Sequence, residues 1–382
     1  MAIEFAASPK PTLGIEVELQ LVDVEKGNLV CVAPDVLAEL GAAHPGGEHP
    51  KAKPELFQCT IEVITGVCET VAQARDDLAA TMIEVQAALA PRGAGFVATG
   101  HHPFTPWYEL DLTNGERYQR LVQRIAWPAR QLTTHGVHVH VGVRSGEKAV
   151  ATVNALSGYL PVFLALSSSS PYWHGQDTGL ASIRTKVFEA MPTTGLPPEL
   201  ESWAEFNDFL DTLINAGTIE SVREVWWDIR PHPGYGTVEL RMCDAMPTLW
   251  ETCAMAALAQ CLVQSFDDMM DAGQRPPVPR VWVRRENKWR AARYGVDADL
   301  VVDGSGRTQP LREVVAEIVA DLMPIAERLD CASELSDLLV IAERGPSYVR
   351  QRRLVEEGLG LDELVGRLRE EMLADLAEPD RA

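Results

Sequence analysis

Alternating hydrophobic and polar positions mark several stretches of the chain as β-strands with one apolar face. In the clearest stretch, 12–24, the residues Ile15, Val17, Leu19 and Leu21 fall on one side, because successive strand side chains point to opposite faces. Alternation and β-branched runs predict further strands at 55–65, 95–100, 135–143, 225–231 and 236–245.

Apolar spacing near 3.6 residues predicts helices between these strands and through the C-terminal part. The predicted ranges are 34–41, 69–92, 116–131, 147–171 and 202–217, then most of the chain after Leu249 except 275–280 and 297–310. Pro161 predicts a kink or break in the fourth helix, and Ser202 with Glu205 forms a capping box at the start of the fifth. Strands and helices without strict β–α–β alternation favour an α+β fold with an antiparallel sheet. We expect one catalytic domain over 1–382, with a sheet-forming core at about 12–245 and a mostly helical part at about 249–375.

The polar faces of the predicted strands carry carboxylates, imidazoles and guanidinium groups. These side chains are Glu16, Glu18, Glu62, His138, His140, Arg230, Glu239 and Arg241. A half-exposed sheet with one solvated face is the ordinary alternative, but such a face usually carries Lys, Ser and Thr. Glutamate-rich sets favour Mg²⁺ or Mn²⁺ over zinc. Arg184, Arg230 and Arg241 add positive charge suited to phosphate or carboxylate groups.

Composition narrows the classes of partner. The chain has 382 residues with 55 acidic and 34 basic side chains, a formal net charge of −21, so we expect no nucleic-acid partner and no anionic membrane partner. We find no apolar run of the ~20 residues that a membrane span needs, and no secretory signal. Seven cysteines without CxxC spacing are typical of reduced thiols in a cytoplasmic protein. The GxxxxGK[ST], GxGxxG and GxSxG motifs are all absent, which argues against P-loop, Rossmann and serine-hydrolase sites.

Eight segments, taken together and in order, resemble the carboxylate–amine ligases related to glutamate–cysteine ligase, type 2. They are GIEVE (14–18), ELFQCTIEV (55–63), GHHPF (100–104), HGVHVHVGV (135–143), LALSSSSPYWHGQDTGLASIRT (164–185), WWDIRPH (226–232), GTVELRMCD (236–244) and ENKWRAARYG (286–295). The resemblance runs from residue 12 to about residue 370. It implies a glutamine synthetase-like fold, in which helices flank a funnel formed by a curved, mainly antiparallel sheet.

The resemblance also implies roles for individual residues. The divalent-metal ligands that hold the ATP phosphates would be Glu16, Glu18, Glu55, Glu62, His138 and Glu239. Arg241 would steady the transferred γ-phosphate, Arg230 would contact a phosphate or acyl phosphate, and Arg184 would bind the carboxylate of the acid substrate. Val17 replaces the middle one of three consecutive acids found in most members of the family, and alternation places it on the core face. Glu55 is out of phase with Glu62, so it requires a bulge or a loop position.

Three further residues are candidates for the nucleotide side of the site. Arg290 and Arg293 lie on the helix predicted around 286–295, where a solvated basic face is the alternative. Trp226 is a candidate for stacking on adenine, and filling of the core is the alternative for one of the Trp226–Trp227 pair. The loops around 101–115 and 172–200 are candidate lids.

The expected reaction joins glutamate and cysteine to give γ-glutamylcysteine, with ATP and Mg²⁺ or Mn²⁺, through an acyl phosphate and with release of ADP and phosphate. Two other functions stay open. One is a metal-dependent amide hydrolase that uses His138 and His140, and the other is a non-catalytic sensor of nucleotides or amino acids on the same fold. The expected partners are small molecules, and a homodimer is expected from analogy of fold alone.

Overall fold

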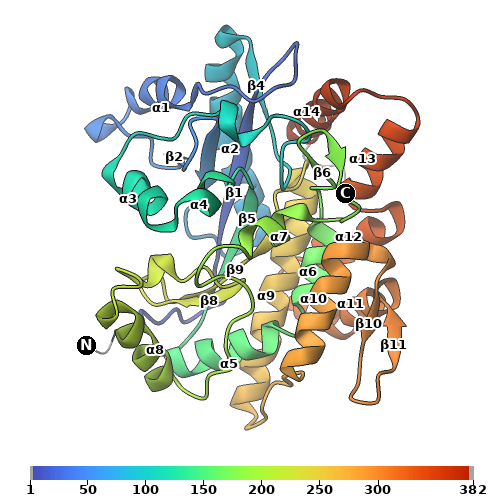
Figure 1. Cartoon of the computed structure of the whole chain (residues 1–382). Coiled ribbons are helices and arrows are strands. Elements are labelled where there is room, and N and C mark those ends of the chain that lie inside the picture. The colour runs from blue at the N-terminus through green and yellow to red at the C-terminus, as the bar shows by residue number, and fades with distance from the viewer. Residues whose placement is uncertain (1–2, 378–382) are drawn as a thin grey trace.

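A seven-stranded antiparallel sheet forms the centre of the computed structural model, which describes residues 3–377 (Figure 1). Its strand order is β2-β3-β1-β5-β9-β8, and β4 pairs with the C-terminal part of β1. The sheet is not closed, and the expected α+β fold is confirmed. The strands of the sheet are β1 (Leu13–Asp23), β2 (Ala52–Pro54), β3 (Thr60–Ile64), β4 (Ala94–Val97), β5 (Gly136–Gly142), β8 (Ile229–His232) and β9 (Thr237–Asp244). Two hairpins lie outside it, β6 (Tyr172–Trp173) with β7 (Gln176–Asp177) and β10 (Asp299–Val301) with β11 (Thr308–Pro310).

Helices occupy most of the remaining chain. The α-helices are α1 (Ala33–Gly41), α2 (Val71–Leu89), α3 (Glu116–Ile125), α4 (Trp127–Arg130), α5 (Gly146–Leu156), α6 (Leu160–Ser167), α7 (Ile183–Phe188), α8 (Trp203–Asn215), α9 (Leu249–Asp271), α10 (Val281–Tyr294), α11 (Leu311–Arg328), α12 (Ala332–Arg344), α13 (Ser347–Glu356) and α14 (Leu361–Ala377). The short 3₁₀ turns are η1 (Pro45–Gly47), η2 (Ala90–Arg92), η3 (Trp107–Glu109), η4 (Val222–Glu224) and η5 (Gly295–Asp297).

One face of the sheet is buried beneath α2, α5, α6 and α9. The apolar side of each strand supplies residues such as Val17, Leu19, Val139 and Leu240, which are at most 1% exposed. Burying one large apolar side chain contributes about 1.5–3 kcal/mol, so this face fixes the strand register. The same core continues into the C-terminal helices, which gather on one side of the molecule (Figure 1). The polar face of the sheet is thereby turned away from the core.

Helix α9 lies in the centre of this core and is apolar around most of its circumference, as a fully enclosed helix should be. Within residues 3–377 no single helix is both long and apolar enough to cross a membrane. Only α5 and α6 together meet the length and composition criteria, and the pair is bent by 63°.

Several predicted elements differ in detail from those observed. The strand predicted at 55–65 begins only at Thr60, so Glu55 lies in the loop after β2, one of the two positions its phase allowed. The helix predicted at 116–131 is divided at Ala126, which has a φ of 61°. The break expected at Pro161 is present, and this proline is the second residue of α6. The strand predicted at 225–231 begins at Ile229, which leaves Trp226 in the preceding loop.

Candidate active site

The register of the sheet brings acidic and imidazole side chains from neighbouring strands together on its polar face. The residues paired across strands are Glu18–Glu62, Glu16–His138 and His140–Glu239. Side chains at directly opposed positions are near neighbours. The polar side chains of four strands, which are distant in the sequence, therefore form one cluster. We call these six residues, together with Glu55, the acidic cluster.

Three sets of possible ligand atoms lie within the acidic cluster. In each set the donor atoms are within 4.8 Å of one another, and the sets are Glu16–Glu62–His138, Glu16–His140–Glu239 and Glu18–Glu55–Glu62. Glu16 and Glu62 each belong to two sets, so the three form a continuous row along the polar face. His138 Nδ1 lies 2.9 Å from Glu16, and His140 Nε2 lies 3.4 Å from the same carboxylate. The row has the spacing needed to hold more than one divalent cation.

Two arginines flank Glu239 at one end of the row. Arg230 donates from Nε and Nη2 to the two carboxylate oxygens at 2.6 and 3.2 Å, and Arg241 donates to one of them. An irregularity in β9 between Leu240 and Cys243 adds a residue opposite β5 and alters the local direction of Arg241. The Arg241 Nη1 atom consequently lies 3.5 Å from His138.

Arg184 reaches the cluster from α7, whose first turn is capped by the Ser182 hydroxyl. Its guanidinium is 5% exposed and donates to the carbonyl oxygens of Arg241 and Met242 at 3.2 and 3.3 Å. The Nε of Arg184 has no hydrogen-bond partner among the described residues. The buried carboxylate of Asp244, held by Ser182, Ser170 and Ser169, supports this corner of the site.

At the acid-rich end of the row, burial outweighs the effect of the nearby arginines. Burial, followed by repulsion from neighbouring carboxylates, raises the pKa of Glu62 well above its usual value. Burial and the charge of Glu55 raise the pKa of Glu18 to about 7. Glu16 differs, because the hydrogen bonds from the two histidines outweigh burial and lower its pKa. Near neutral pH, Glu18 is therefore partly protonated, and a bound cation would displace that proton.

The opposite end of the row is charge-balanced. Burial opposes ionisation of Glu239, but Arg230 and Arg241 hold its pKa well below the usual range. Burial, followed by the charge of Arg241, lowers the pKa of His138 to about 4. The imidazole is therefore neutral at pH 7, which is the form that binds metal.

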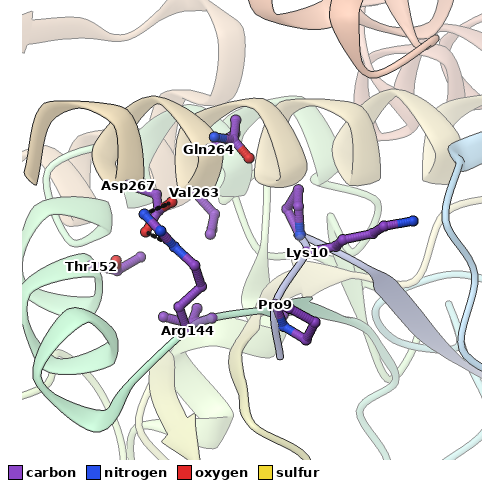
Figure 2. Close-up of a pocket in the computed structure, with 10 residues that line it drawn as sticks. Pro9, Lys10, Arg144, Thr152, Val263, Gln264 and Asp267 are labelled. Atoms are coloured by element: carbon purple, nitrogen blue, oxygen red, sulfur yellow. Dashed lines mark hydrogen bonds and ion pairs between the residues drawn. The ribbon is translucent and has the colours of Figure 1, made fainter. Parts of the chain in front are cut away.

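Two clefts of similar volume lie in this part of the molecule, and the first of them includes Glu16 and His140 of the acidic cluster. The Tyr235 cavity, about 580 Å³, is lined by 6–9, 12–16, 64–67, His140, Gly234, Tyr235 and Thr237. The arginine cleft, about 560 Å³, lies between α3 and η4 and is lined by Arg117, Arg120, Leu121, Gln123, Arg124, Glu220, Ser221, Arg223, Glu224 and Trp226. A third cavity, where Arg144 reaches Asp267 on α9, has only about 30 Å³ (Figure 2). That volume holds about one water molecule. A fourth cavity, about 330 Å³, is large enough for a small ligand and is lined by Glu286, Trp289, Arg290, Tyr294, Asp297 and Asp299.

Two of the arginines predicted on the nucleotide side do not reach the cluster. Arg290 bonds to Glu286 and to the carbonyl of Asp299 on the outer face of α10. Arg293 bonds to the carbonyl of Gly179 and lies over the ring of Tyr294. Among the described residues neither arginine forms a hydrogen bond or ion pair with the acidic cluster, and their role on the nucleotide side stays a prediction.

Trp226 lines the arginine cleft and is half-buried, but it is not part of the acidic cluster. Two other residues enter the site that the sequence reading left out of the ligase site. His140 lies on the predicted polar face but is not among the metal ligands that the resemblance implies, and its alternation with His138 on one strand was the available signal. Tyr235 had no signal, because it lies in the turn between β8 and β9.

Comparison with known proteins gives a consistent relationship. The sequence profile of glutamate–cysteine ligase family 2 matches residues 12–371. A protein of Frankia casuarinae with the provisional name glutamate–cysteine ligase 2-1 is 52% identical over 373 residues, which cover 97% of this chain and 98% of that protein. A Thermobifida fusca protein provisionally named glutamate–cysteine ligase 2 is 48% identical over 374 residues, 98% of this chain and 94% of its own length.

Solved structures agree on the fold. The Francisella tularensis glutamate–cysteine ligase, determined in complex with AMP, superposes with a TM-score of 0.71 over 97% of this chain and 90% of its own, at 12% identity. The profile match and the two relatives extend over nearly the whole sequence, including every strand that carries the acidic cluster. The chain belongs to glutamate–cysteine ligase family 2, and it is a carboxylate–amine ligase, an enzyme that forms a carbon–nitrogen bond.

Proposed function

We propose that this ligase uses ATP to activate a substrate carboxylate as an acyl phosphate, which an amine then converts to an amide. The observation that carries the proposal is the row of three ligand sets that share Glu16 and Glu62, with Arg241 at its edge. In the first step a carboxylate oxygen of the acid attacks the γ-phosphorus and ADP leaves. In the second step the amine nitrogen attacks the acyl carbon, loses a proton, and inorganic phosphate leaves.

The donor set of the acidic cluster fits Mg²⁺ or Mn²⁺. Carboxylate oxygens dominate it, and hard cations prefer oxygen ligands. The raised pKa values of Glu18 and Glu62 reflect burial and crowded negative charge, which divalent cations would neutralise. The cations would be held by Glu16, Glu18, Glu55, Glu62, His138, His140 and Glu239, the predicted ligands with His140 added. When bound, such ions neutralise and orient the phosphates of ATP.

The Tyr235 cavity suits the base of the nucleotide. The Tyr235 ring is 61% exposed and stacks on His232, with the ring centroids 4.1 Å apart and the planes 11° from parallel. An aromatic face held in this way is a platform for a purine. The cavity also includes Glu16 and His140, so a base bound there directs its phosphates along the acidic cluster.

The three arginines near the acidic cluster have different roles in the proposed reaction. Arg241, beside His138 and Glu239, stabilises charge that develops on the transferred phosphoryl group. Arg184, with an unpartnered Nε, binds a carboxylate of the acid substrate, for which the family name points to glutamate. Arg230 orients Glu239 and is held on both sides, so it is a positioning residue. The second substrate is an amino acid, and cysteine is the one that the family name implies.

ADP release tests the proposal. The enzyme is incubated with Mg²⁺, ATP, glutamate and cysteine, and then with each component omitted in turn. ADP and an ATP-dependent dehydrative product, seen by mass spectrometry, should form only with all components. Glu239→Gln and Glu62→Gln should abolish both, whereas Glu343→Gln, an exposed glutamate on α12, should not. Turnover of peptides without ATP would overturn the proposal in favour of a hydrolase, and nucleotide binding without turnover would favour a sensor.

A further inference from the structure

The arginine cleft carries a positive charge that the rest of this acidic chain does not predict. Arg117, Arg120 and Arg124 are spaced by three and four residues on α3, so they share one helix face. Arg223 faces them from η4, and the cleft contains four arginines against two glutamates. A solvated surface of a protein with net charge −21 would be expected to carry acids instead.

Most of this positive charge is free to meet a ligand. Arg124 pairs with Glu224 at 2.8 Å and so bridges the two walls. Within residues 3–377 neither Arg117 nor Arg223 has an ion-pair partner, and Arg120 has only an exposed contact of 3.5 Å along its own helix. Arginines left unpaired in a concave site are suited to fork-like binding of carboxylates.

Hydrogen bonds connect both walls of the cleft to segments that neighbour or carry the acidic cluster. The α3 wall is attached where the Tyr118 hydroxyl donates to the carbonyl of Pro54, beside Glu55. The η4 wall is attached through Arg230, whose Nη1 donates to the carbonyls of Val222, Arg223 and Val225 at 3.0, 3.1 and 2.8 Å. The same guanidinium bonds to Glu239. One side chain, Arg230, therefore separates the η4 wall of the cleft from Glu239 of the acidic cluster.

We infer that the arginine cleft binds the amine substrate, and that this amine carries a second negative group, as an amino dicarboxylic acid does. The inference rests on the proposed ligase reaction, and it replaces the cysteine implied by the family name with an acidic amine. The acid must place its reacting carboxylate at the γ-phosphate over the cluster, and the Tyr235 cavity, which has no lysine or arginine in its lining, suits the nucleobase. The arginine cleft therefore suits the remaining substrate, the amine, which attacks in the second step. Cysteine, with one carboxylate, leaves part of the arginine set unpaired.

Amine selectivity provides the test. With glutamate as the acid and Mg²⁺-ATP saturating, the amines compared are aspartate, its neutral isostere asparagine, and cysteine, and mass spectrometry identifies each product. One additional charge-assisted contact predicts a kcat/KM for aspartate about tenfold or more above that for asparagine and cysteine. Isothermal titration of aspartate and asparagine, in the presence of a non-hydrolysable ATP analogue and Mg²⁺, should show the same order without turnover.

Substitutions then test whether the selectivity for the amine arises in the arginine cleft. Arg120→Ala and Arg223→Ala, neither of which contacts the acidic cluster through its side chain, should raise the KM for aspartate about fivefold or more and leave the KM values for ATP and glutamate unchanged. Arg130→Ala, an exposed arginine on α4 outside the cleft, is the matched control. Equal use of asparagine and aspartate, or a change in the KM for ATP or glutamate instead, overturns the inference but not the ligase. Failure of every amine to elicit ADP release overturns the proposed function, and the inference with it.

Discussion

Removal of Arg230 should destabilise the protein strongly, because this one side chain joins two parts of the site. It is 6% exposed and makes two bonds to Glu239 and three to the backbone carbonyls of η4 and Val225. Arg230→Ala leaves the Glu239 carboxylate, itself 1% exposed, with Arg241 as its remaining cationic partner in direct contact. Arg230→Lys keeps the charge but offers three donors in place of five.

The size of the loss follows from these contacts. Breaking a buried ion pair by removing one partner costs about 3–5 kcal/mol, since the other charge stays buried. Three backbone carbonyls also lose their charged donor, which increases the loss of stability. Water that enters the space left by the side chain offsets part of this loss. We expect Arg230→Ala to lower the free energy of unfolding by about 4 kcal/mol and Arg230→Lys by about 2 kcal/mol.

Urea unfolding followed by circular dichroism measures both values. A double-mutant cycle with Glu239→Ala isolates the pair, and the double variant should be at least ~1.5 kcal/mol more stable than the sum of the single effects predicts. Arg130→Ala again serves as the control and should stay within about 0.5 kcal/mol of the parent. If Arg230→Ala costs less than ~1 kcal/mol, or if the two substitutions are additive, Arg230 does not connect Glu239 to the cleft wall as described.

Three further outcomes are expected. A Cβ on Gly136 would lie 2.2 Å from the Arg184 guanidinium, so Gly136→Ala should displace that arginine and raise the KM for the acid, whereas Gly304→Ala, with open space around it, should not; steady-state kinetics decide. Burial raises the pKa of Asp337 to about 6, above its value in the unfolded chain, so the folded protein binds the extra proton and loses stability as the pH rises from about 4 through 6. Asp337→Asn should therefore have a higher Tm than the parent at pH 8 and little advantage at pH 4, and an unchanged Tm at pH 8 refutes this. Addition of Mg²⁺ should raise the Tm and release protons at pH 7, and Glu62→Gln should reduce both effects in calorimetry.

Strand alternation accounts for most of what could be predicted about the site. A period of two fixes which side chains share a face, so Glu16, Glu18, His138 and Glu239 could be assigned to one surface before the strand order was known. Strand order and register depend on contacts between distant segments, and no local pattern encodes them. The loop position of Glu55 was foreseen as one of two options because its spacing from Glu62 violates the period.

The sequence of helix α10 does not predict which of its charged residues are buried. The spacing of its residues suggested that Arg290 and Arg293 could face the site, but the buried face includes Arg284, Asn287 and Lys288. The ammonium of Lys288 is enclosed between carboxylates of other segments, 2.6 Å from Asp228 and 2.8 Å from Glu189. Hydropathy predicts that a charged residue such as Lys288 is exposed to solvent. The carboxylates that the fold places around it offset the cost of burying its charge.

Charge distribution explains how a chain with net charge −21 can bind anionic substrates. The acidic cluster concentrates glutamates where divalent ions would reverse the local sign, and burial with mutual repulsion raises the pKa values of Glu18 and Glu62. The arginine cleft achieves a positive sign without metal, through side chains left without partners on α3 and η4. The two sites suit different anions. Metal ions in the acidic cluster suit phosphates, whereas the guanidinium groups of the arginine cleft suit the carboxylates of an amine substrate. Under the proposed function, ATP and a charged amine would therefore bind to different cationic groups, ATP to the metal ions and the amine to the arginines.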